Sequence, residues 1–195
     1  MGLAVFLAQQ AGFAVFVSAF RAEKLGRGVA FHAGVFGRII PGHEEDGVFR
    51  EVSIAAGVAS MARSRGAALV DMNLDGLLDL AVVNRRVPME IYQNITATDG
   101  NWLAVSLSQP GANSRAVGAW LELRLGDRII AREITVGGGH ASGAAVPEHF
   151  GLGAAGAADL RIIWPDGQQS DWLPLSAGQT WEITRTPEGA TARAR

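Results

Sequence analysis

A ten-residue stretch, DMNLDGLLDL at 71–80, concentrates acidic and amide side chains in this 195-residue chain. Its three carboxylates alternate with an amide and apolar residues, and like charges held so close together repel one another unless a cation lies among them. Gly76 allows the sharp turn with positive φ that a tight cation-binding loop needs. Ca²⁺ takes about six to eight oxygen ligands, from carboxylates, amides and backbone carbonyls. We predict a calcium site formed by Asp71, Asn73, Asp75, Asp79 and the backbone carbonyl of Leu77.

The loop differs from an EF-hand in its flanking elements. An EF-hand carries a bidentate Glu at the last position of the loop and a helix on either side, whereas the equivalent residue here is Val82. The runs at 67–70 and 77–83 are short and aliphatic, and they predict buried β-strands. We therefore expect the ion in a strand-to-strand hairpin. The alternative is an Asp/Asn-rich turn that binds no metal.

The composition excludes several classes of protein. With 48% hydrophobic residues the chain can bury a core, and Lys+Arg 17 against Asp+Glu 19 offers little attraction to nucleic acid. The absence of cysteine excludes disulfides, thiolate zinc sites and cysteine nucleophiles. Extracellular calcium modules bind with modest affinity and are filled where calcium is abundant, so we expect an exported protein, extracellular or periplasmic.

The N-terminal region up to residue 46 is uncertain in fold. Residues 1–20 carry no charge, and Val17, Ser18 and Ala19 are similar to a signal cleavage site, but no Lys or Arg precedes the apolar run. A signal peptide or short membrane helix is one interpretation, and buried strands or a core helix are the other. Any association with a membrane would involve this segment alone.

The rest of the chain has the pattern of strands and turns. Apolar residues alternate with others in WLAVSL at 102–107 and VGAWLELRL at 117–125, which predicts strands with one buried face. The tail at 187–195 has little to bury, and we expect it to fray. Further strands are predicted at 87–94, 128–136, 159–164 and 180–185.

Two sets of motifs resemble known families. FREVSIAAGV, RGAALVDMNLDGLLDLAVVN and IYQN resemble an FG-GAP (VCBS-type) β-propeller blade, and NWLAVSL, VGAWLEL, REITVGGGHAS, HFGLG and IIWPDG resemble the ASPIC/UnbV domain. Together they resemble the C-terminal part of the cartilage acidic protein (ASPIC/UnbV) family of exported proteins. The resemblance implies an all-β chain, with a partial propeller blade and calcium loop at 47–96 followed by a small β-sandwich or barrel-like domain at 100–186.

Only one such blade is evident in the sequence, whereas a closed propeller needs about four to eight. We therefore expect either a fragment of a longer propeller protein or a lone unit packed on the second domain. In a lone unit the open strand edges would allow self-association.

Two patterns that could support catalysis are incomplete. The stretch at 151–156 matches the dinucleotide fingerprint G-x-G-x-x-G, but no crossover helix fits before the next strand, and the resemblance makes FGLG a structural turn. Ser142 with His140, His149 and Glu148 lacks the G-x-S-x-G elbow of a hydrolase, and the two histidines lack a third zinc ligand.

We therefore predict no enzymatic activity. The expected function is that of an extracytoplasmic calcium-binding module for adhesion to an unknown protein or glycan ligand. All five tryptophans lie after residue 100, and Trp120, whose position in its strand is opposite to the buried leucines, is the best exposed candidate for ligand contact. The alternative is an accessory domain of an exported hydrolase that acts on carbohydrate.

Overall fold

The computed structural model describes residues 6–8, 20–22, 27–33, 39–45, 48–51, 53–54, 56–96, 99–137, 143 and 145–195. These residues form strands and turns without a helix, which confirms the predicted all-β fold. Accordingly, the described part of the chain contains no helix long and apolar enough to cross a membrane.

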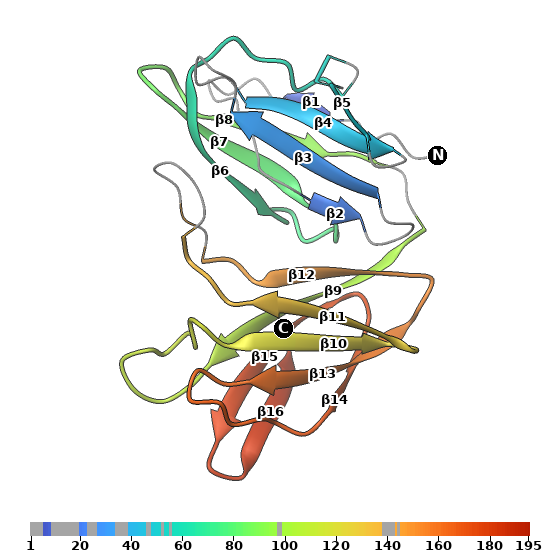
Figure 1. Ribbon diagram of the computed structural model, residues 1–195, viewed down its shortest axis with the longest axis vertical. Helices are drawn as coiled ribbons and strands as arrows, with labels where there is room; N and C mark the ends of the chain where they lie inside the picture. Colours follow the sequence, from blue (N-terminus) through green and yellow to red (C-terminus); the bar gives the residue numbers. More distant parts are fainter. Residues whose placement is uncertain are drawn as a thin grey trace. The chain divides into compact units, whose positions relative to one another are not determined.

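The chain divides into two compact units, residues 1–98 with 137–144 and residues 99–136 with 145–195. The first unit contains two four-stranded antiparallel sheets (Figure 1). Their orders are β2-β3-β4-β5 and β1-β8-β7-β6. The strands are β1 (Phe6–Ala8), β2 (Phe20–Ala22), β3 (Arg27–Ala33), β4 (Ile39–Glu45), β5 (Val48–Glu51), β6 (Ser64–Val70), β7 (Asp79–Asn84) and β8 (Glu90–Asn94).

The β6–β7 hairpin carries the acidic loop, as the sequence predicts. Leu80 and Val82 of β7 point into a small core while Val83 is exposed, so the alternation of apolar residues sets the buried face of the sheet. The core consists of Ala56, Val58, Leu80, Val82 and Tyr92.

The sheet that contains the acidic loop takes its fourth strand from the N-terminal region. β5 pairs with β4 in the other sheet, and the place beside β8 belongs to β1, which lies within residues 1–20. Most of residues 1–20, including the predicted cleavage site, lies outside the described residues.

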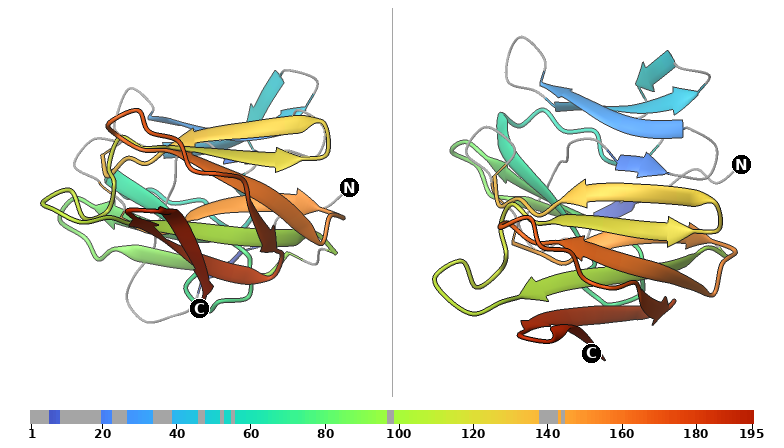
Figure 2. Two further views of the ribbon diagram at one scale, coloured as in Figure 1. Left: turned by 90° about the horizontal axis from the view of Figure 1, so that it is seen from below. Right: turned by 60° about the horizontal axis from the view of Figure 1, so that its bottom comes forward.

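The second unit also contains two four-stranded sheets, in the orders β12-β9-β15-β16 and β11-β10-β13-β14 (Figure 2). β9 and β15 are parallel, and the other neighbouring strands are antiparallel. The strands are β9 (Asn101–Ser108), β10 (Trp120–Leu125), β11 (Arg128–Glu133), β12 (Glu148–Gly153), β13 (Ala157–Ile163), β14 (Leu173–Ser176), β15 (Gln179–Thr186) and β16 (Gly189–Ala194).

One apolar core joins these two sheets into a β-sandwich. Leu121 and Leu123 of β10 are fully buried, as are Leu103 of β9 and Ile183 of β15 in the other sheet. Such interdigitation of two inner faces is the usual core of a sandwich. Neither described sheet closes on itself, so of the two predicted architectures the sandwich applies rather than the barrel.

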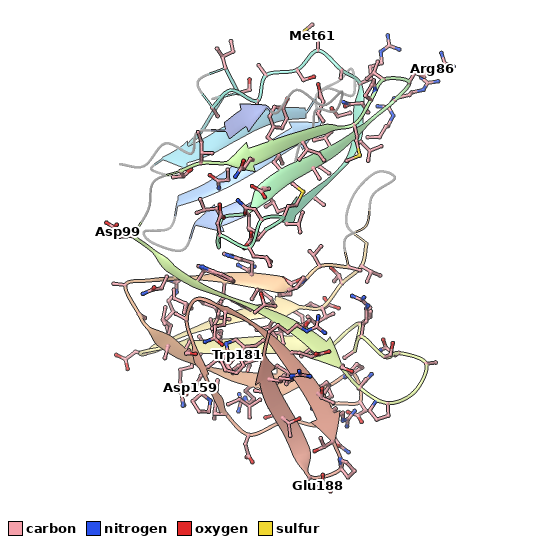
Figure 3. The ribbon with its side chains drawn as sticks, turned by 180° about the vertical axis from the view of Figure 1, so that it is seen from behind. Met61, Arg86, Asp99, Asp159, Trp181 and Glu188 are labelled. Atoms are coloured by element: carbon pink, nitrogen blue, oxygen red, sulfur yellow. The ribbon has the colours of Figure 1, made fainter. Side chains whose placement is uncertain are left out.

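Two segments differ from the prediction. HFGLG is part of strand β12 rather than a turn, and an irregularity between Gly151 and Gly153 keeps it paired with β9. The tail forms β16 rather than fraying, in a hairpin with Glu188 at its tip (Figure 3). It buries few side chains, but its backbone pairs with the edge of β15, and Arg195 forms an ion pair with Glu182.

Candidate functional site

The predicted calcium loop connects β6 to β7, whose last paired residues are Val70 and Asp79. Gly76 has a φ of 86°, as the sequence predicts, and Leu74 also takes a left-handed conformation with a φ of 62°. The loop is therefore tightly wound. Among the predicted ligands, Asp79 is buried with 1% exposure, Asp71 and Leu77 are half-buried, and Asn73 and Asp75 are exposed.

The loop winds around the side chains of Asp71 and Asp75. The two oxygens of Asp71 accept hydrogen bonds from the backbone N–H groups of Asp75 (3.1 Å) and Gly76 (2.8 Å). Asp75 accepts from the N–H of Leu77 and from the amide of Asn73, both at 2.8 Å. The structure thus brings Asp71, Asn73 and Asp75 together.

Asp79 ties the loop to the neighbouring strand. Its Oδ2 accepts from the N–H of Met72 at 3.0 Å, and its Oδ1 accepts from the N–H of Asn94 at 2.8 Å. Burial raises the pKa of Asp79, and the charges of Asp75 and Asp71 raise it further, while the two N–H donors lower it. The ionised form of Asp79 is therefore disfavoured by its surroundings.

Asn94 is a contributor that the sequence prediction missed. Its backbone N–H donates to the carboxylate of Asp79, and its side-chain amide donates to the carbonyl of Leu78 at 3.3 Å. Its place at the end of the IYQN strand was visible in the sequence. Its pairing with Asp79 depends on the register of β7 and β8, which the sequence did not reveal.

The donor set of the loop suits calcium in its chemistry. A carboxylate offers about four lone-pair positions, and the hydrogen bonds to Asp71, Asp75 and Asp79 leave part of that capacity for a metal. The carboxylates do not form a ready-made cage, because the described residues contain no group of three or more His, Cys, Asp or Glu placed to hold a metal ion.

The second candidate, Trp120, lies on the outer face of the sheet β11-β10-β13-β14. It is 44% exposed, as its parity in the strand predicts, and its neighbours across the sheet are Glu133 on β11 and Ile163 on β13. Next to them on the same face, Glu122 pairs with Arg161. Trp120 is therefore available to a ligand.

The residues of the incomplete catalytic patterns do not assemble among the described residues. His140 and Ser142 lie outside the described part. His149 is buried in β12 and stacks on Trp102 with 5.5 Å between ring centroids. The G-x-G-x-x-G stretch forms strand β12 and the turn to β13, so it does not open a helix as a dinucleotide site requires.

Glu148 provides a test of the electrostatics of the sandwich. Burial raises its pKa above the ordinary 4.5, against the opposing effect of Arg132, which lies 3.8 Å away. The folded state therefore binds a proton at the Glu148 carboxyl more tightly than the unfolded chain does. As a result, the free energy of unfolding falls as the pH rises from 4.5 through the raised pKa. Glu148→Gln should therefore be more stable than the wild type at pH 7, by less than about 1 kcal/mol.

This advantage should shrink to nothing as the pH falls below 4.5, which urea denaturation at several pH values would measure. Arg132 keeps its hydrogen bond to the carbonyl of His149 at 2.8 Å and its contact with the Phe150 ring in the variant. An equal stability difference at both ends of the pH range would contradict the assignment to Glu148.

Comparison with known proteins finds a family match in the C-terminal half of the chain. Residues 109–190, from the end of β9 into β16, match the model of the family described as ASPIC and UnbV. The chain is 26% identical to cartilage acidic protein 1 from Homo sapiens over 135 residues, which are 67% of this chain and 20% of the human protein. The Xenopus tropicalis protein of the same name is 30% identical over 110 residues, 54% of this chain and 17% of that protein.

The chain thus spans about a fifth of the length of these relatives. Among solved structures, a Bacteroides uniformis protein proposed to act in cell adhesion aligns over 100% of this chain and 97% of its own, with a TM-score of 0.30 and 11% identity. A similarity at that level supports no argument about fold or function. The family match shows that this chain contains an ASPIC/UnbV domain at residues 109–190.

Proposed function

We propose that this chain is a noncatalytic, calcium-stabilised binding module that acts outside the cytoplasm, as part of a longer protein with FG-GAP-type repeats. One observation carries the proposal: a single hairpin loop holds three carboxylates, and one of them, Asp79, is buried beside the charges of the other two. A divalent cation would offset this repulsion. The match of residues 109–190 to the ASPIC and UnbV family supports the family resemblance from which this proposal draws its expectation of a binding module.

In the proposed site, calcium would supply positive charge and draw the oxygen donors together. Asp79, fixed by two backbone donors, would be the anchor, and the exposed Asp75 and Asn73 would swing toward it. Asp71 and the carbonyl of Leu77 would complete the protein ligands. Affinities of about 10⁻⁴–10⁻³ M are typical of extracellular calcium modules, so the site would fill outside the cell.

Asp75→Ala tests this proposal with little structural cost, because Asp75 is exposed and water can replace it as acceptor for the N–H of Leu77 and the amide of Asn73. At a calcium concentration about ten times Kd, the wild type should gain about 1.4 kcal/mol relative to excess chelator. Asp75→Ala should lose most of that gain, since a charged ligand is missing, and should match the wild type in chelator. Thermal unfolding with and without calcium measures both values.

Met72→Ala is the matched control, because Met72 is an exposed residue of the same loop whose side chain offers no oxygen. It should retain the full gain in calcium. Equal unfolding temperatures for the wild type and Asp75→Ala in saturating calcium would refute the site.

A further inference from the structure

The outer face of the sheet β11-β10-β13-β14 carries a second tryptophan besides Trp120. Leu173 pairs with Leu160, so Trp172 immediately precedes β14 beside Arg161. Its ring lies against the guanidinium groups of Arg124 at 4.3 Å and Arg161 at 4.7 Å. These two arginines occupy the same face as Trp120, because residues of a strand two apart point the same way.

The register of the sheet sets the separation of the two tryptophans. Trp120 lies on β10 and Trp172 at the start of β14, with β13 between them. Two strand spacings amount to about 10 Å. The two tryptophans thus start from different strands of one face, and one extended ligand can contact both of them.

The polar groups around the two indoles are paired with each other. Glu122 accepts from Arg161 at 2.8 Å, and Asp159, labelled in Figure 3, accepts from Arg124 at 2.8 Å. All four side chains keep between 20% and 42% of their surface exposed. The middle of the face is therefore neutral overall, and it presents fixed donors and acceptors to solvent.

This combination selects one class of ligand. An anionic ligand would need unpaired arginines, and an apolar protein partner would need a broader apolar patch than a tryptophan and a few aliphatic neighbours. A sugar ring has an apolar face that stacks on an indole and a rim of hydroxyl groups that hydrogen-bond to carboxylates and guanidinium groups. A neutral sugar rich in hydroxyl groups therefore matches this face in its charge and in its hydrogen-bonding groups.

We propose that this face binds a neutral, extended oligosaccharide, with sugar rings on Trp120 and Trp172 and hydroxyl groups on the Glu122–Arg161 pair between them. The inference rests on the proposed role of the chain as a binding module and names its ligand class. It involves residues of the second unit alone and is independent of the calcium loop.

Isothermal titration of the full chain with cellohexaose, xylohexaose and mannohexaose tests the proposal. At least one of these neutral hexasaccharides should bind, and Trp120→Ala should weaken that binding about tenfold or more, because it removes one stacking platform. Trp120→Phe should recover part of the affinity. Since Trp120 is 44% exposed, its replacement leaves the core intact, and an unchanged unfolding temperature verifies this.

Ile129→Ala is the control on the same sheet, because Ile129 is exposed on the neighbouring strand β11 and away from the proposed path between the indoles. It should bind like the wild type, and so should Asp75→Ala in chelator. Loss of calcium binding alone would therefore leave this result unaffected. The proposal is overturned if none of the three sugars binds, or if Trp120→Ala binds as tightly as the wild type.

Discussion

Asp79→Ala is expected to lower the free energy of unfolding of the first unit by about 2–3 kcal/mol even in chelator. The reason is that Asp79 accepts the backbone N–H groups of Met72 and Asn94, and alanine leaves both donors without this partner in a partly buried place. Relief of the repulsion with Asp71 and Asp75 offsets part of this loss. Urea denaturation followed by circular dichroism would measure the change.

Asp79→Asn separates the hydrogen bonds from the charge. Asparagine has one acceptor oxygen, so it can satisfy one of the two N–H groups while its amide faces the other. Its stability should lie between those of the wild type and Asp79→Ala. Asp75→Ala, at an exposed position of the same loop, should be almost neutral in chelator. If Asp79→Ala proved as stable as Asp75→Ala, Asp79 would not anchor the loop.

Phe150→Ala should lower the stability of the second unit by about 3–5 kcal/mol. Phe150 is fully buried in β12 within the core of the sandwich, and the guanidinium of Arg132 lies 4.7 Å from its ring centroid. Alanine would leave a cavity and remove that contact. Phe150→Leu should cost less, because it fills part of the space.

Tryptophan fluorescence is the suitable measurement for Phe150→Ala, because all five tryptophans belong to the second unit. Ile129→Ala is its control, since a half-exposed side chain of the same unit should change stability by no more than about 0.5 kcal/mol. If Phe150→Ala lost no more stability than Ile129→Ala, this result would contradict the burial of Phe150 in the core of the sandwich.

Residue alternation predicted much of the second unit. In β10 the leucines at 121 and 123 are buried, and Trp120 is exposed on the opposite face, because the side-chain period of two is a local property of a strand. HFGLG and the tail have no such pattern. HFGLG became a strand because β9 offers a partner for its backbone, and the tail because β15 does, and neither partner can be identified from the segment itself.

The candidate site shows the same division between local and distant information. The turn at Gly76 and the order of the acidic residues follow from the sequence of the loop. The burial of Asp79 and its bond to Asn94 depend on the pairing of β7 with β8, across 15 positions of the chain. Trp172, the second indole of the proposed ligand-binding face, likewise reaches Arg124 and Arg161 only through the order of strands in the sheet.

The most direct test of the calcium-stabilised module is a calorimetric titration of the folded wild-type chain with Ca²⁺, beside Asp75→Ala. The proposal predicts saturable heat with about one ion per chain in the wild type, at a Kd of roughly 10⁻⁴–10⁻³ M, and much weaker binding in the variant. Absence of heat in the wild type at millimolar calcium, or identical isotherms for the two proteins, would contradict it.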